Sequence, residues 1–209
     1  MPRRTPDRTA VAPRGFIWYG FHRLFPMRTI VLSSSLIAFS VACGYAKLLL
    51  FPYLFFVELF TVAVFLSGIL AGPVWGLWIG AVSRLVFSVA NPYGPPHPWI
   101  LAAQLLGGAL VGAIGGFARP WLLLAPESSG VFRARSAVLL ACGLLTTLLY
   151  DGLTNLAQGI AFGSFSVAIA LGLLPAAQHL ASNLVIFGLI GNLAIPWLRR
   201  HPMAARHAA

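Results

Sequence analysis

Charged residues are scarce in this chain of 209 residues. Asp and Glu together number 4, Lys and Arg number 14, and the four types make up only 9% of the sequence. Hydrophobic residues make up 59%, and the mean hydropathy is +0.86. Ordinary water-soluble domains carry about 25% charged residues, so that class is excluded. Several apolar stretches reach the roughly 18 residues that a helix needs to cross a bilayer. We therefore expect an all-α, polytopic membrane protein.

Catalytic and metal-binding patterns are also missing. The only cysteines, Cys43 and Cys142, lie in apolar stretches, which excludes a disulfide framework and a CxxC site. The sequence has no GxxxxGK(S/T) phosphate loop, no HExxH motif and no nucleophile with an evident base. We therefore expect no enzyme, no cofactor and no metal, and any ATP hydrolysis must come from a partner.

Six membrane-spanning helices fit the apolar segments. We predict them at about residues 29–50, 57–71, 74–90, 99–118, 136–158 and 170–198. This gives a basic N-terminal tail over 1–28, without a signal peptide, a membrane domain over 29–198 and a short C-terminal tail over 199–209. Pro175 and Pro196 lie near the two ends of the last span, so its ordered core is expected to be shorter.

The basic residues predict the orientation. They form three groups: Arg3, Arg4, Arg8, Arg14, Arg23 and Arg28 before the first span; Arg119, Arg133 and Arg135 around the connection between the fourth and fifth; Arg199, Arg200 and Arg206 after the sixth. The connections at 91–98 and 159–169 carry no Lys or Arg. With six spans all three groups lie on the cytoplasmic side of the cell membrane, so both termini are expected in the cytoplasm. The net charge of +10 thus sets topology and does not indicate nucleic-acid binding.

Polar residues from different spans fall in the outer half of the membrane in this topology. Ionisable or amide side chains at that depth are costly unless they are paired or face a wet cavity. They therefore outline a solute pocket open to the outside, with aromatic walls. The candidate binding residues are Glu58, Arg84, Asn91, Tyr93, Trp99, Gln104, Tyr150, Asp151, Asn155, His179 and Asn183. The proline-rich segment 91–99 is either a tight connector or a lid over this pocket.

Several of these residues have a structural alternative. Glu58 either contacts the ligand or pairs with Lys47 or Arg84, and Arg84 either clamps an anionic ligand or neutralises Asp151 or Glu58. Asp151 and Asn155 lie one helical turn apart, and a second such pair follows in the last span. Hydrogen bonds between helices are the alternative for both pairs.

Small residues repeat every four positions in three spans. They are Ser34, Ala38, Ala42 and Ala46; Gly72, Gly76 and Gly80; and Gly108, Gly112 and Gly116. Small residues at this spacing let helix backbones approach closely. For the two glycine stripes we expect packing inside the bundle, whereas the alanine stripe of the first span is placed to face another protein.

The order of the motifs resembles a known family. AFSVA at 38–42, VELFT at 57–61, FLSGILAGP at 65–73, SVANPYGPP at 88–96, YDGLTN at 150–155 and HLASN at 179–183 are similar to segments of the substrate-binding (S) component of energy-coupling factor (ECF) vitamin transporters. The resemblance covers about residues 29–198. It implies a receptor for a vitamin or related micronutrient that docks, through Ala38 and Ala42, on a transmembrane coupling subunit bearing two cytoplasmic ATPases. Ala46 continues the same stripe.

Other functions remain open at this point. A non-transporting scaffold of the cell envelope would not need the polar cluster, and an intramembrane enzyme lacks its motif. A divalent-metal uptake subunit could use His97 and His179, but a histidine after the initiator Met, which related nickel and cobalt subunits use, is replaced by Pro2. Flavins, pterins, pantothenate, biotin and corrinoids all fit the mixed pocket, whereas the few cationic residues disfavour a multiply charged phosphate ester.

Overall fold

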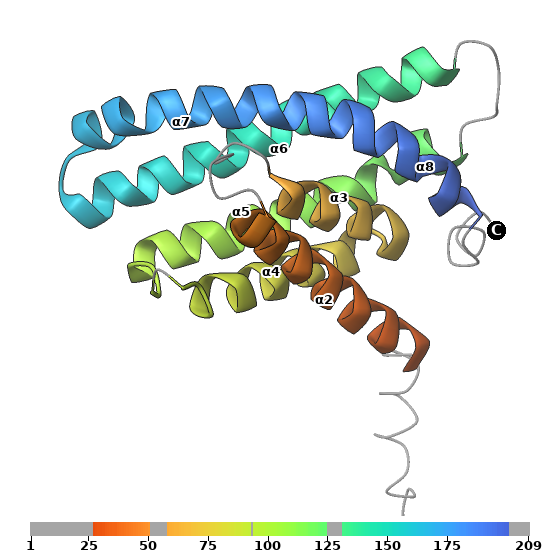
Figure 1. The fold of residues 1–209 in the computed structure, drawn as a ribbon, viewed down its shortest axis with the longest axis horizontal. Helices are drawn as coiled ribbons and strands as arrows, with labels where there is room; N and C mark the ends of the chain where they lie inside the picture. The colour runs from red at the N-terminus through yellow and green to blue at the C-terminus, as the bar shows by residue number, and fades with distance from the viewer. Residues whose placement is uncertain (1–26, 51–57, 93, 125–130, 201–209) are drawn as a thin grey trace, which may run out of the picture.

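The described part of the computed structural model, residues 27–50, 58–92, 94–124 and 131–200, is helical throughout and contains no strand. Figure 1 shows how the described helices are arranged. Their order is α2 (Met27–Leu50), α3 (Leu59–Ala71), α4 (Pro73–Val89), α5 (Pro98–Arg119), η1 (Pro120–Leu124), α6 (Val131–Phe162), α7 (Phe165–Ile186), η2 (Phe187–Gly191) and α8 (Asn192–Arg199). Here η marks a π-helical turn. The all-α fold class is confirmed.

Four helical stretches are long and apolar enough to cross a membrane. They run Met27–Leu49, Pro98–Leu123, Phe132–Phe162 and Phe165–Arg199, whereas α3 and α4 are shorter. Large apolar side chains point outward all along these helices, for example Val31, Leu148, Leu171 and Trp197. An apolar exterior of this extent suits lipid and not water, so the chain is a multi-pass membrane protein.

The last two long helices differ from the prediction. The connection predicted at 159–169 is helical apart from residues 163–164, where Gly163 adopts φ +69°. The stretch after it is helical from Phe165 to Arg199 and includes both prolines. The expectation of a shorter ordered core was therefore wrong. Pro175 is tolerated since neighbouring backbone can satisfy the groups that a proline leaves free inside a membrane helix.

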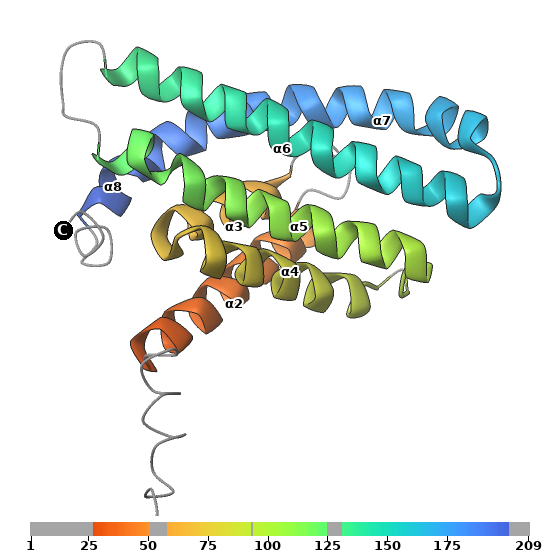
Figure 2. The same ribbon diagram turned by 180° about the vertical axis from the view of Figure 1, so that it is seen from behind.

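The core is centred on α3. Nearly every residue of this short helix is buried, including Phe60, Phe65 and Ile69, and the cluster continues through Leu139 of α6 and Phe187 of η2. A helix that is apolar on all sides belongs in the middle of a bundle. Figures 1 and 2 show α3 between the pair α4–α5 and the long pair α6–α7.

Glycines allow α3, α4 and α5 to touch through their backbones. A Cβ added at Gly76 would clash with the carbonyl of Gly112, and one at Gly80 would clash with the carbonyl of Gly108. On α3, Gly68 meets the same carbonyl of Gly112. The expected packing inside the bundle is confirmed for the glycine stripe of α5 and for Gly76 and Gly80 of α4, whereas Gly72 forms the turn before α4.

Arginines tie helices together at the end of the bundle where α5 ends and α6 begins. Arg119, expected around the connection between the fourth and fifth spans, is the last residue of α5. It is buried and donates from Nη1 to the carbonyl of Leu70 in α3, 3.2 Å away. Arg199 donates from Nε and Nη2 to the carbonyl of Leu122, at 3.1 and 2.9 Å. Cations at carbonyls of helix ends are favourable, so these arginines hold structure as well as bias topology.

Candidate functional site

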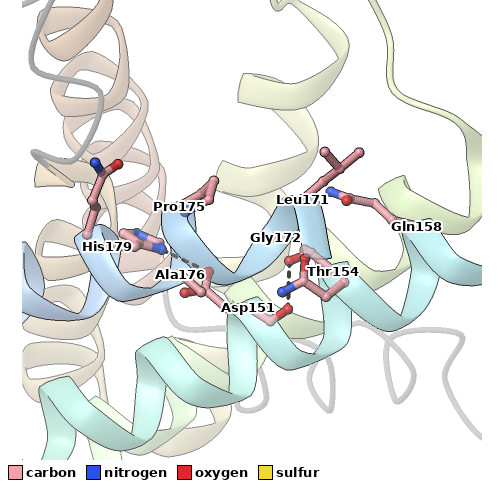
Figure 3. Close-up of a pocket in the computed structure, with 10 residues that line it drawn as sticks. Asp151, Thr154, Gln158, Leu171, Gly172, Pro175, Ala176 and His179 are labelled. Carbon is pink, nitrogen blue, oxygen red and sulfur yellow. Dashed lines mark hydrogen bonds and ion pairs between the residues drawn. The ribbon is translucent and has the colours of Figure 1, made fainter. Parts of the chain in front are cut away.

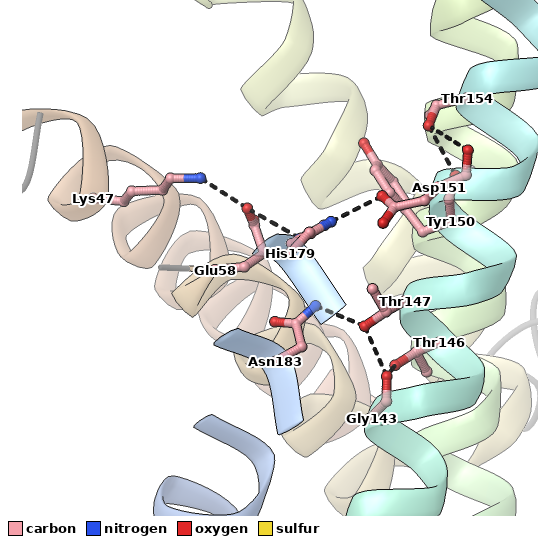
Figure 4. Close-up of polar contacts among 10 residues, drawn as sticks. All are labelled: Lys47, Glu58, Gly143, Thr146, Thr147, Tyr150, Asp151, Thr154, His179 and Asn183. Carbon is pink, nitrogen blue, oxygen red and sulfur yellow. Dashed lines mark hydrogen bonds and ion pairs between the residues drawn. The ribbon is translucent and has the colours of Figure 1, made fainter. Parts of the chain in front are cut away.

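Four ionisable side chains join four helices at the opposite end of the bundle, and we call them the ion chain: Lys47, Glu58, His179 and Asp151 (Figure 4). Lys47, in the last turn of α2, donates from Nζ to Oε2 of Glu58 over 3.0 Å. The same Glu58 oxygen lies 3.7 Å from Nε2 of His179 on α7, and Nδ1 of His179 lies 2.8 Å from Oδ1 of Asp151 on α6. The structural alternative for Glu58, a pair with Lys47, is thus formed.

His179 is the centre of this chain because a carboxylate faces each of its ring nitrogens. The side chains of Glu58, Asp151 and His179 are only 13–17% exposed, so their mutual attraction is weakly screened. A protonated imidazole would interact favourably with both carboxylates, whereas a neutral ring can donate to only one of them. The arrangement therefore fixes the ring between α6 and α7.

A pocket of about 520 Å³ opens beside this histidine, between α6 and α7 (Figure 3). Polar and small residues from both helices line it: Asp151, Thr154, Asn155, Gln158, Leu171, Gly172, Pro175, Ala176, Gln178 and His179. The volume suits a small organic molecule. Oδ2 of Asp151, beside this pocket, is buried without a hydrogen-bond partner among the described residues, so it is an acceptor whose donor is missing there.

Asn155 reaches into the pocket because α7 carries a glycine opposite it. An added Cβ at Gly172 would overlap the Asn155 amide, so the amide lies directly against the α7 backbone. Its carbonyl and NH₂ groups give the wall one acceptor and two donors. Asp151 and Asn155, one helical turn apart on α6, both line the pocket.

The second pair divides between two roles. His179 lines the pocket, but Asn183 is fully buried and donates from Nδ2 to Oγ1 of Thr147 over 2.8 Å. Thr147 in turn donates to the carbonyl of Gly143 in its own helix, α6. Asn183 thus forms a hydrogen bond between helices, the alternative to ligand binding: its side chain joins α7 to α6 and does not line the pocket.

Arg84 is not part of the ion chain. It comes from α4, is 7% exposed, and lies over the rings of Phe60 and Tyr150, with its Cζ atom 4.1 and 4.6 Å from their centroids. Neither Glu58 nor Asp151 comes within 4.0 Å of its guanidinium nitrogens. Arg84 therefore makes no direct ion pair with either carboxylate, although it interacts electrostatically with Glu58 over a longer distance.

The remaining predicted residues lie apart from the pocket. Gln104 accepts a hydrogen bond from Ser88 over 2.8 Å, which ties α5 to α4. Asn91 accepts from the backbone of Gly94 in the turn before α5, and Trp99 is 58% exposed in the first turn of that helix. Tyr150 lies between Arg84 and His179, with its ring centroid 6.3 Å from that of the histidine. Tyr93 lies outside the described residues.

Sequence reasoning missed some residues of the site. Phe60, which packs on Arg84, carries no signal because any apolar position of a membrane helix can hold a phenylalanine. Thr154 and Gln178 line the pocket and neighbour Asn155 and His179 in the sequence, so a search for polar residues beside the predicted pairs would have found them.

No family model, curated protein or solved structure matches this chain. Within the described residues, no group of three His, Cys, Asp or Glu side chains is arranged to hold a metal ion.

Proposed function

We propose that the protein is the substrate-capture subunit of an ATP-driven importer of the ECF type, which binds a vitamin or related micronutrient and does not catalyse. In this proposal the chain crosses the cell membrane six times, both termini are cytoplasmic, and the α6–α7 pocket opens to the outside. Delivery follows docking on a transmembrane coupling subunit that carries two cytoplasmic ATPases.

One observation carries the proposal: a pocket lined largely by polar side chains lies between two helices of membrane-spanning length and adjoins the partly buried ion chain. Asp151, Asn155 and His179 meet there although the sequence separates them, and ionisable groups inside membrane proteins are functional candidates by default. A scaffold protein would have no need to keep an acid, an imidazole and an amide around an open space of this size.

The outer face of α2 supports the partner side of the proposal. Ala38 and Ala42 are exposed, and Ala46 is partly buried, so most of the small-residue stripe faces away from the bundle. The opposite face of α2 packs inward through Ser40 and Gly44, against α3 and α4. An exposed row of small residues lets a second helix approach closely in lipid.

The shortness of α3 supports a cavity at the outer side. Its 13 residues cover about 20 Å at the usual rise of 1.5 Å, whereas the hydrocarbon core is roughly 30 Å thick. In the six-span topology we assign the missing length to the outer side, so that α3 begins below the outer surface, directly after Glu58. Non-helical backbone is tolerated at that depth where it is buried in protein or lines a water-filled cavity.

Native mass spectrometry of the detergent-purified protein, combined with organic extraction, tests the capture role. We expect one vitamin-like molecule per chain, lost in Asn155→Ala and weakened in His179→Ala. Asn192→Ala is the matched control, since this asparagine bonds to Ser136 near the other end of the bundle and its loss should leave the ligand in place. A wild-type protein that carries no molecule and binds none from a vitamin mixture would contradict the proposal.

A further inference from the structure

We propose that the α6–α7 pocket takes an uncharged molecule with an amide-type group, an N–H beside a C=O, and that this N–H donates to the backbone carbonyl of Leu171; the inference rests on the proposed capture function. Two features of the structure support it. The charges beside the pocket already cancel, and Pro175 removes the donor that the Leu171 carbonyl has in a regular helix. The substrate class is therefore a neutral amide, lactam or urea.

Four Lys, Arg, Asp or Glu residues lie within the six predicted spans, and their charges sum to zero. Lys47 and Arg84 are the cations, and Glu58 and Asp151 are the anions. Lys47 lies 3.0 Å from Glu58, and Arg84 interacts electrostatically with Glu58 over a longer distance. Asp151 lies 2.8 Å from His179. With a neutral imidazole, this end of the bundle needs no charge from a ligand.

The pocket itself offers no partner for an acidic ligand. No Lys or Arg is among the described residues that line it, and the acid there is Asp151. A carboxylate or phosphate on the ligand would therefore meet a like charge. A cationic ligand would meet Asp151, but Lys47 and Arg84 already offset the two acids of the spans. An uncharged ligand avoids adding an uncompensated charge to a membrane-spanning bundle, which is costly.

Three carboxamide side chains line the two walls of the pocket. Asn155 and Gln158 come from α6, and Gln178 comes from α7. None of the three makes a hydrogen bond to another described residue. Each carboxamide has a C=O acceptor and an NH₂ group with two donors. An apolar ligand would remove water from these groups without replacing its hydrogen bonds, whereas a ligand with its own N–H and C=O can replace them.

Pro175 frees a backbone acceptor at the pocket. In a regular helix the N–H of residue 175 would donate to the carbonyl of Leu171, four positions earlier, but proline has no N–H. Leu171 and Pro175 both line the pocket, and Figure 3 shows them projecting from the same side of α7. Among the described residues, no hydrogen bond reaches Leu171 from outside its helix. A ligand N–H can therefore take the place of the missing donor.

Asn155 adds a donor beside this carbonyl. Its amide lies against Gly172, the residue that follows Leu171 in the sequence. No hydrogen bond between the Asn155 amide and Leu171 is present in the described part of the chain. An amide-type group of the ligand can therefore donate its N–H to Leu171 and accept with its C=O from Asn155.

Pairs of probes that share an amide-type group and differ in charge test the substrate class. They are pantothenol and pantothenate, biotinamide and biotin, and riboflavin and riboflavin phosphate. Equilibrium binding is measured on the detergent-purified protein at about pH 8.5, where an ordinary imidazole is neutral, and any extracted molecule is measured in the same way. We expect the neutral member of at least one pair to bind, and its charged partner to bind at least about 10-fold more weakly, because its charge is unbalanced.

Variants connect the result to the two features. Pro175→Ala restores the N–H, so it should weaken binding of the neutral probe by about 2- to 10-fold, the worth of one neutral hydrogen bond. Pro196→Ala makes the same change inside α8, near the other end of the bundle, and should leave binding unchanged. Asp151→Asn leaves one excess positive charge, so it should shift the preference towards the anionic member of the pair.

Four results would overturn the inference: a charged probe or extracted ligand that binds as tightly as its neutral analogue, an extracted ligand without an amide-type group, full binding by Pro175→Ala, or an unchanged charge preference in Asp151→Asn. In each of these cases a molecule still binds, so the capture function stands. A protein that yields no molecule on extraction and binds no probe would contradict the capture function itself, and this inference with it.

Discussion

The substitution Gly112→Ala should destabilise the bundle far more than its single methyl group suggests. The added Cβ would fall against the carbonyl group of Gly76, and backbone cannot rotate away as a side chain can. Either α4 and α5 separate along their contact or the helices deform. Overpacking a well-packed core by a methylene costs typically 1–3 kcal/mol, and a backbone clash belongs at the upper end, about 3 kcal/mol.

Gly152→Ala provides the matched control because it makes the same chemical change inside a helix. Gly152 lies in α6 with nothing within 4 Å of an added Cβ, so only helix propensity changes there, which favours alanine by about 1 kcal/mol. The propensity gain is common to both variants and cancels in their difference. The two free energies of unfolding should therefore differ by about 3 kcal/mol.

Unfolding of both variants in mixed micelles, followed by far-ultraviolet circular dichroism as the fraction of denaturing detergent rises, measures this difference. A difference below about 0.5 kcal/mol, the usual spread of surface substitutions, would refute the reasoning. It would mean that α4 and α5 do not touch through their glycines and that the close packing of the bundle is wrong.

Three further outcomes are expected. Gly172→Ala should displace the Asn155 amide and weaken ligand binding by about 2- to 10-fold, the worth of one neutral hydrogen bond, as measured by equilibrium binding against wild type. A double-mutant cycle of Lys47→Met and Glu58→Gln in unfolding experiments should give a coupling energy of about 1–3 kcal/mol, and none if the 3.0 Å pair is absent in the membrane. Ala38→Trp should leave ligand binding intact but block co-purification with the coupling subunit; normal assembly would contradict the docking face.

The sequence predicted the helices well where apolar length and punctuation agree. Gly72 and Pro73 mark the turn between α3 and α4, with Gly72 at φ +86° and proline opening the next helix. The prediction of a long α6–α7 connection failed because residues 159–169 contain no proline and only two glycines to mark it. Whether these residues continue the helices depends on the pairing of the two long helices.

The sequence predicted which polar side chains share a helix face, but not which residues lie opposite them. A one-turn spacing places Asp151 beside Asn155 and His179 beside Asn183 on one face, yet it does not say what lies opposite. Opposite Asn183 stands Thr147, which closes the space, whereas opposite Asn155 stands Gly172, which leaves room. For Arg84 the sequence left a ligand contact and an ion pair open for a related reason: charge counting cannot show that Lys47 and His179 already contact the two nearby acids.

The position of the pocket follows from the way the helices pack. Glycine contacts bring α3, α4 and α5 together through their backbones, so no ligand fits at the points where these glycines meet. The α6–α7 interface is held at Asn183 by a hydrogen bond to Thr147 and at His179 by Asp151, and beyond these contacts it is lined by polar side chains around an open volume. A ligand that bonds to both walls would therefore brace α6 against α7, while α3, α4 and α5 are already fixed. Binding should consequently protect backbone amides near the α6–α7 pocket from hydrogen exchange and leave those at the α4–α5 contact unchanged.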